Sequence, residues 1–252
     1  VKDLTQKNDY AICFSHMSPL LSIIANWYNK NKRTISMLWY THPTPEELIK
    51  KIVLYMSIFF NNQIVTASES SFPYFSKKVN VIGHAIDYDA FLIKKTNISN
   101  NDFVILSRIS KSKNLELSID CFLKSKFNQD SITVIGDAVT DTDMEYKAFL
   151  TEKYRTNNNV IFKGMISHKE LPGVLKSYSY HINSTPPGFY DKSVLETLAA
   201  GIYNFYLNED YDKHFDPKSL KYTKFSSKQN SLTDLLNSVY ELNDNKILEI
   251  RS

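Results

Sequence analysis

Residues 184–201 read Ser184-Thr-Pro-Pro-Gly-Phe-Tyr-Asp191-Lys-Ser-Val-Leu-Glu196-Thr-Leu-Ala-Ala-Gly201, and this stretch decides the predicted fold. It follows a short strand predicted at Ser179–Asn183 and passes through a turn with two prolines and a glycine. A helix is then predicted from Asp191 to Ala200, with Asp191 as its N-cap. A strand, a loop and a helix N-terminus in this order direct backbone N–H groups toward the edge of a sheet, where they can hold a phosphate.

Glu196 lies one turn into this predicted helix, so its carboxylate could reach the same crevice. The alternative is that Lys192 and Glu196, four residues apart, form only an exposed ion pair on a solvated helix face. The stretch alone leaves both interpretations open.

Strands and helices alternate along the chain, which predicts an α/β fold with parallel, doubly wound sheets. The predicted strands are Asp9–Phe14, Arg33–Tyr40, Gln63–Ala67, Val79–Ile82, Phe103–Ile109, Ser131–Ile135, Asn159–Phe162, Ser179–Asn183 and Ile202–Leu207. The predicted helices are Leu20–Trp27, Glu46–Phe60, a short one from Ser68, Leu115–Leu123, Met144–Tyr154, His168–Lys176, Asp191–Ala200 and Ser231–Leu242. The polar stretch Tyr88–Asn101 is a natural crossing between domains, so two domains are expected, at residues 1–92 and 93–252.

Composition excludes several classes of protein. Of the 252 residues, 42% are hydrophobic and 23% charged, as in ordinary globular proteins, which excludes disordered and fibrous classes. The net charge is only +3, and the charged residues are scattered along the chain and form no basic stripe, so no nucleic-acid partner is expected. Cys13 and Cys121 lie far apart and are expected to be reduced, as in a cytoplasmic protein.

The predicted helix Glu46–Phe60 allows two interpretations. Its Lys50 and Lys51, followed by apolar residues, could contact a membrane surface peripherally. An inward-facing helix beside a sheet has the same pattern and is the preferred interpretation. The apolar run Ile52–Phe60 is too short to span a bilayer.

A second group of chemical interest follows the predicted strand Phe103–Ile109. Arg108 and Lys113 are placed at the carboxyl end of this strand and the start of the next helix. There they could clamp an anionic phosphate, Arg108 by a bidentate fork and Lys113 as a point charge. A solvated basic loop is the alternative. The phosphate interpretation is favoured because the junction before Glu196 opens onto the same crevice in a doubly wound sheet.

The order and spacing of several motifs resemble glycosyltransferase family 4, whose members are retaining enzymes of the GT-B fold. The similar segments are Trp39–His42, Val65–Ser70, Ile82–Asp87, Ser107–Lys113, Val134–Asp137, Val160–Gly164 and Asp191–Glu196. The resemblance covers nearly the whole chain. It implies two Rossmann-like domains that enclose a nucleotide-sugar, with residues 1–92 in the acceptor domain and residues 93–252 in the donor domain.

The resemblance also implies roles for individual residues. Arg108 and Lys113 match a basic pair that neutralises the donor diphosphate without a metal ion or other cofactor. Glu196 matches the acid that accepts hydrogen bonds from the ribose. His42 matches a histidine near the transferred sugar, although a purely structural role before a helix is equally open. The residues implied in donor binding are Arg108, Lys113, Gly164, Met165, Ile166, Gly188, Phe189, Asp191 and Glu196, and those implied in catalysis are His42, Arg108 and Lys113.

This sequence departs from the family pattern in three places. The first acid of the family's Glu-x7-Glu motif falls at Gly188, so its contact with the sugar is missing or is supplied by backbone N–H groups or Asp191. Tyr203 replaces a common proline. No glycine precedes Gly83, so the family's glycine-rich loop is absent and Val1 is expected to lie inside the acceptor domain, leaving an exposed sheet edge and apolar surface.

The sequence therefore predicts a hexosyltransferase-type enzyme that moves a sugar from a UDP- or GDP-sugar to an acceptor hydroxyl with retention, in glycan or polysaccharide synthesis. The acceptor is open: a glycan, a lipid-linked molecule or a small molecule. The expected location is the cytoplasm, with the inner face of the membrane as an option. The alternatives are a nucleotide-sugar binding fragment without turnover and another GT-B enzyme, such as a sugar-nucleotide epimerase. A dehydrogenase is disfavoured because no Gly-x-Gly-x-x-Gly follows any predicted strand.

Overall fold

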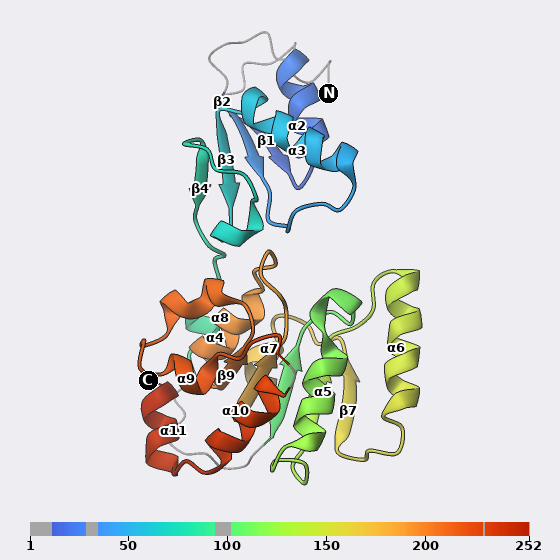
Figure 1. Ribbon diagram of the computed structural model, residues 1–252, viewed down its shortest axis with the longest axis vertical. Helices are drawn as coiled ribbons and strands as arrows, with labels where there is room; N and C mark the ends of the chain where they lie inside the picture. Colours follow the sequence, from blue (N-terminus) through green and yellow to red (C-terminus); the bar gives the residue numbers. More distant parts are fainter. Residues whose placement is uncertain (1–11, 29–34, 94–101, 229, 252) are drawn as a thin grey trace. The chain divides into compact units, whose positions relative to one another are not determined.

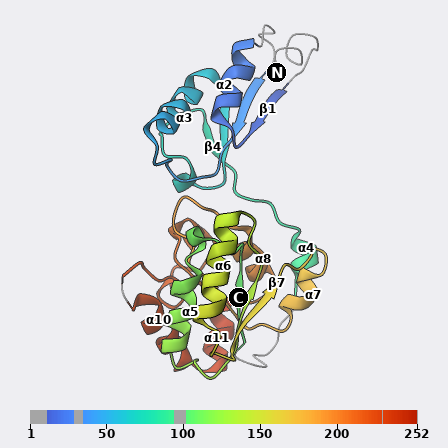
Figure 2. The same ribbon diagram turned by 90° about the vertical axis from the view of Figure 1, so that its right-hand side faces the viewer.

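The computed structural model describes residues 12–28, 35–93, 102–228 and 230–251. The chain forms two compact units, drawn in Figures 1 and 2. The first comprises Val1–His84 with Pro187–Tyr190, and the second comprises Ala85–Pro186 with Asp191–Ser252. The beginnings of the strands predicted at Asp9–Phe14 and Arg33–Tyr40, and residues 94–101 of the predicted crossing, lie outside the described residues.

The first unit contains a parallel sheet in which the strands follow one another in sequence order. The strands are β1 (Ile12–His16), β2 (Ile35–Trp39), β3 (Gln63–Thr66) and β4 (Val79–Val81). Between them lie α2 (Pro19–Tyr28), α3 (Leu48–Phe60) and the short 3₁₀ helix η1 (Glu69–Ser71). The helices α2 and α3 pack side by side along the sheet (Figure 1). A small core of Leu38, Tyr40, Leu54, Ile64 and Phe72 lies between α3 and the sheet.

Much apolar surface of the first unit is exposed in the described residues. Ile12 and Phe14 of β1, an edge strand of the described sheet, are 54% and 55% exposed. The outer face of α3 is apolar as well, since Leu48, Ile49, Ile52, Tyr55, Met56 and Phe59 are all exposed. Only Leu54 and Ser57 of α3 are fully buried, so the preferred interpretation of this segment as an inward-facing helix is wrong for most of its apolar residues.

The second unit contains five parallel strands. They are β5 (Phe103–Leu106), β6 (Ile132–Ile135), β7 (Val160–Gly164), β8 (Tyr180–Asn183) and β9 (Tyr203–Tyr206). Their order in the sheet is β7-β6-β5-β8-β9. From β5 the chain first adds β6 and β7 on one side of this strand, and then crosses back to add β8 and β9 on the other side. This reversal makes the carboxyl ends of β5 and β8 the switch point of a doubly wound sheet, where ligands of such folds bind.

Helices surround this sheet. They are α4 (Tyr88–Phe91), α5 (Leu115–Lys124), α6 (Asp141–Lys153), α7 (Leu171–Leu175), α8 (Lys192–Ala199), α9 (Leu220–Thr223), α10 (Ser231–Tyr240) and α11 (Asp244–Arg251), with the 3₁₀ segments η2 (Lys111–Lys113) and η3 (Glu209–His214). The short elements α4, η2, η3, α9 and α11 were not predicted, and α4 lies in the stretch expected to be a polar crossing. The predicted start of α6 at Met144 is too late, because a capping box of Thr140 and Asp143 starts the helix at Asp141.

Alternate residues of the strands point to two cores. Phe103 of β5 joins a large aromatic core in which its ring stacks on Tyr180 at 4.7 Å between centroids. Val104, the next residue, joins a second core that contains Phe91 and Leu171. Because both faces are covered, β6, β8 and β9 are buried along their whole length. In β8 and β9 this burial includes the polar residues His181, Asn183 and Asn204.

The boundary between the domains differs from the predicted one at residues 92/93. The second unit begins at Ala85, because Phe91 of α4 is fully buried in the second core and α4 packs on α8. Elsewhere the predicted helix at His168–Lys176 shortens to α7, whose first residue is Leu171. Cys121 is buried and Cys13 half-buried, and neither forms a disulfide within the described residues.

Candidate functional site

The loops that follow β5 and β6 are tied together at the carboxyl edge of the sheet. Gly136 follows β6 with a φ of +139°, and a Cβ atom there would lie 1.9 Å from the carbonyl oxygen of Ser107. The Ile109 N–H donates to the Asp137 carbonyl at 3.0 Å. The backbone around Arg108 is thus held against the end of β6, which fixes where the Arg108 side chain begins.

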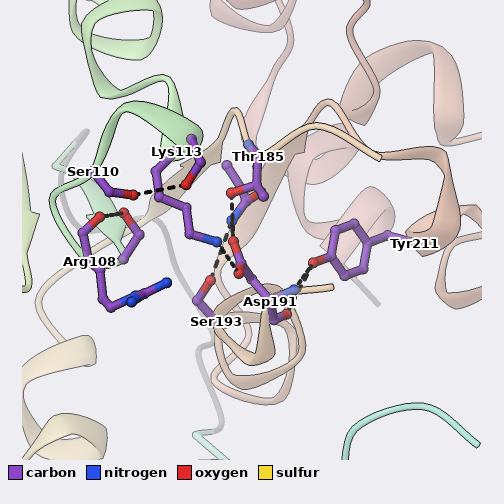
Figure 3. A network of polar contacts seen from close by, with 10 residues as sticks. Arg108, Ser110, Lys113, Thr185, Asp191, Ser193 and Tyr211 are labelled. Atoms are coloured by element: carbon purple, nitrogen blue, oxygen red, sulfur yellow. Dashed lines mark hydrogen bonds and ion pairs between the residues drawn. The ribbon is translucent and has the colours of Figure 1, made fainter. Parts of the chain in front are cut away.

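Arg108 and Lys113 both emerge from the segment after β5, but their surroundings differ (Figure 3). Arg108 is exposed, and its guanidinium pairs with no carboxylate among the described residues. The side chain of Lys113 is only 7% exposed, and its Nζ lies 2.5 Å from Oδ1 of Asp191. The expected basic pair is therefore one exposed cation and one buried cation that already has a counter-ion.

Asp191 occupies the N-cap position of α8, but its side chain makes no cap hydrogen bond to that helix. The predicted N-cap position is confirmed, but the carboxylate makes its hydrogen bonds elsewhere. Besides Lys113, it accepts hydrogen bonds from Oγ1 of Thr185 at 2.6 Å and Nδ2 of Asn183 at 3.2 Å. Burial alone would raise the pKa of Asp191, yet the charge of Lys113 and these hydrogen bonds lower it, so the carboxylate is ionised at neutral pH.

Hydrogen bonds also join α5 to the end of β8. Asn114 donates through Nδ2 to the carbonyl of Ser184 at 3.1 Å, and the hydroxyls of Ser118 and Ser184 lie 2.6 Å apart. Asn114 adopts a left-handed conformation with a φ of +48°, between η2 and α5. These contacts fix the two loops that carry Lys113 and Asp191 at the switch point of the sheet.

Glu196 is buried, at 6% exposure, so the interpretation of Lys192 and Glu196 as an exposed ion pair is wrong. Its Oε1 lies 3.2 Å from Nε2 of His168, which the sequence analysis had not singled out. His168 follows β7 by only a few residues, and its ring contacts Phe91 at 5.2 Å between centroids. No local pattern could have identified this pair, because 28 residues separate its members.

The loop predicted to contact a nucleobase, Gly164–Ile166, lies just before His168. Gly164 ends β7 and its carbonyl accepts from the N–H of Gly136 at 2.9 Å. Met165 is 73% exposed, whereas Ile166 packs against the second core. The contact between His168 and Glu196 brings this loop near α8, so the acid and the loop that were predicted to contact a ribose and a base lie close together, and these two roles stay predictions.

Gly188 and Phe189 belong to the segment that groups with the first unit. The N–H of Gly188 donates to Oγ of Ser70 at 2.6 Å. The ring of Phe189 lies 5.6 Å from that of His42, which is exposed in the loop after β2. The expected roles of Gly188, Phe189 and His42 toward a sugar donor stay predictions.

The described part of the chain holds no group of three or more His, Cys, Asp or Glu side chains placed to bind a metal ion. Its helices are also too short or too polar for any of them to cross a membrane. A cavity of about 930 Å³ in the second unit is lined by residues of α4, α8 and α11, and none of the predicted donor-site residues lines it. The candidate site is therefore the polar network at the sheet edge (Figure 3).

Comparison by sequence gives no match, either to protein-family models or to curated proteins. Comparison with solved structures gives matches over nearly the whole chain. The chain is similar to HepE from Anabaena in complex with UDP, with 15% identity, a TM-score of 0.76, and coverage of 96% of this chain and 71% of that chain. TarM from S. aureus in a complex that includes UDP matches with 14% identity, a TM-score of 0.70, and coverage of 99% and 51%. The lipopolysaccharide outer core galactosyltransferase WaaB matches with 11% identity, a TM-score of 0.66, and coverage of 99% and 72%.

These identities show the fold alone. The predicted fold class is confirmed: the chain contains two Rossmann-like units with parallel sheets of four and five described strands, as in structural neighbours of GT-B type. Membership of glycosyltransferase family 4 stays a prediction.

Proposed function

We propose that this chain is a glycosyltransferase that binds a nucleotide-sugar in its second unit and transfers the sugar to an acceptor hydroxyl. One observation carries the proposal. Lys113 pairs with Asp191 at the N-terminus of α8, and Arg108 follows β5 at the same switch point, where a doubly wound sheet binds nucleotides (Figure 3). A buried acid, Glu196, lies on the same helix at the distance of one further turn.

The chemistry assigned to this site is the departure of a nucleoside diphosphate. The bond between the anomeric carbon and the diphosphate oxygen breaks, and its electron pair stays on that oxygen. The acceptor oxygen bonds to the same face of the anomeric carbon, and its proton passes to the departing phosphate. Arg108 and the N–H groups of α8 stabilise the charge that develops on the phosphate. Retention and independence of a metal ion follow the family resemblance and belong to the proposal.

UDP is the first nucleotide to test, because the complexes of HepE and TarM contain UDP. GDP is the second. The acceptor is proposed to belong to glycan or polysaccharide synthesis, with the protein working in the cytoplasm or at the inner face of the membrane. Product analysis distinguishes a transferase from an epimerase, because an epimerase changes the sugar without any acceptor.

Replacing Arg108 by alanine is expected to weaken UDP binding tenfold or more, since a charged hydrogen bond to phosphate contributes about 1.5–3 kcal/mol. The measurement is calorimetric titration of the folded chain with UDP, GDP and inorganic pyrophosphate. All ligands that bind the wild-type chain should bind the variant more weakly. The control is Arg155→Ala, which removes an exposed arginine of the same unit that pairs with Glu152. Unchanged binding in the Arg108 variant would remove the phosphate site from the proposal.

Glu196→Gln tests the ribose contact separately from the phosphate contact. A neutral amide accepts hydrogen bonds from ribose hydroxyls less strongly than a carboxylate, so UDP should bind about tenfold more weakly. Pyrophosphate has no ribose, so its affinity should not fall. Equal weakening of both ligands would show that Glu196 acts on the fold or the charge of the site and does not contact the ribose.

A further inference from the structure

Asp191 is held in place by four residues, three at its carboxylate and one at its backbone. Its side chain contacts Lys113, Thr185 and Asn183, as described above. Its backbone is held by Tyr211 of η3, which is completely buried. The Tyr211 hydroxyl accepts from the Asp191 N–H and donates to the Asp191 carbonyl at 3.1 Å (Figure 3). Asp191 is thus a fixed negative charge at the N-terminus of α8.

The Asp191 carboxylate contacts Nζ of Lys113, the same atom to which a bound diphosphate is proposed to form its ion pair. An ammonium group has three donors, and Oδ1 of Asp191 takes one of them at 2.5 Å. A phosphate approaching Lys113 therefore comes within several ångströms of a carboxylate of the same sign, and the two repel each other. Arg108 has no such competitor among the carboxylates of the described residues.

We propose that Asp191 is an internal counter-ion that competes with the diphosphate for Lys113, so that it lowers the affinity for the nucleoside diphosphate and speeds its release. The inference rests on the proposed function, because it concerns the same phosphate site. Asp191 is a positioning residue here: it acts on the ligand through the ammonium group of Lys113. An enzyme that must release a diphosphate product in each cycle turns over faster when an internal competitor speeds this release.

Asp191→Asn keeps the shape of the side chain and removes its charge. We expect UDP and pyrophosphate to bind about three- to tenfold more tightly at low salt, with a smaller gain at high salt. The gain should appear as slower dissociation in stopped-flow measurements. It should be smaller in a Lys113→Met background, because only the direct repulsion between the Asp191 carboxylate and the phosphate is then left to remove. Asp191→Ser, which also lacks the charge, replaces the Asn variant if that protein does not fold.

Asp120→Asn is the control, because Asp120 of α5 forms a more exposed ion pair with Lys153 of α6, at 2.8 Å, outside the candidate site. Its UDP affinity should equal that of the wild type. If wild-type UDP binding is measured and Asp191→Asn binds no tighter, or binds more weakly, the competition is wrong while the proposed site stands. If the wild type binds no nucleotide but Asp191→Asn binds pyrophosphate, Asp191 competes with phosphate for Lys113, and the proposed nucleotide site fails. If neither protein binds either ligand, both proposals fail.

Discussion

Replacing Gly136 by alanine is expected to lower the free energy of unfolding of the second unit by about 3 kcal/mol or more. The new Cβ atom would lie 1.9 Å from the Ser107 carbonyl oxygen and 2.8 Å from its carbon, both of them backbone atoms that cannot rotate away. The φ of +139° adds strain for any residue with a side chain. The loops after β5 and β6 would have to separate, which would also displace Arg108.

Gly173→Ala is the matched control for this prediction. Gly173 lies inside α7, and a Cβ atom there would meet nothing within 4 Å. Alanine is the better helix former, so this variant should unfold at equal or higher urea concentration than the wild type. Urea titrations of the three proteins followed by circular dichroism give the comparison. Equal stability of Gly136→Ala and the wild type would mean that the loops after β5 and β6 can move apart at little cost.

The stability of the second unit is expected to fall as the pH decreases from about 6.5 to about 4, because of His181. This residue of β8 is completely buried. Its Nδ1 lies 2.6 Å from Oδ1 of Asn204, and Nε2 has no hydrogen-bond partner within the described part of the chain. Burial lowers the pKa of His181 to about 4. The folded protein therefore keeps the neutral ring at pH values where the unfolded chain takes up a proton.

The lower pKa of His181 in the folded state than in the unfolded chain sets the direction of the pH dependence. Above pH 6.5 neither state is protonated at His181, and the residue makes no pH-dependent contribution to stability. Between pH 6.5 and 4 only the unfolded state binds the proton, so the free energy of unfolding falls by on the order of 3 kcal/mol over this interval. Urea unfolding at pH 7, 6 and 5 measures the slope.

His181→Gln removes the titrating group, so its stability should depend less on pH between 7 and 5, whatever its stability at pH 7. The exposed His16 supplies the control, His16→Gln, which should keep the wild-type slope. If His181→Gln has the same slope as the wild type, the pH dependence arises from other groups, and His181 is protonated or solvated in the folded protein.

The order of strands and helices was largely predictable, because it depends on patterns within short segments. The stripe of Leu115, Ile119 and Phe122 predicts α5, and the alternation of strands and helices along the chain predicts the parallel sheets. Short or polar elements such as η3 and α11 were missed because their local patterns are weak. Their positions depend on packing, such as that of Tyr211 and Ile247 in the interior.

The sequence by itself determined that Arg108 and Asp191 lie after two strands of a parallel sheet, because strand and helix propensities act within a few residues. Only the tertiary structure decided what these side chains contact. The Lys113–Asp191 pair spans 78 positions of the chain, and it forms because burial places β8 beside β5. For the same reason Asp191 pairs with Lys113 and leaves α8 without its side-chain cap, and Glu196 meets His168 instead of Lys192. Contacts of this kind follow from the strand order, which no local pattern contains.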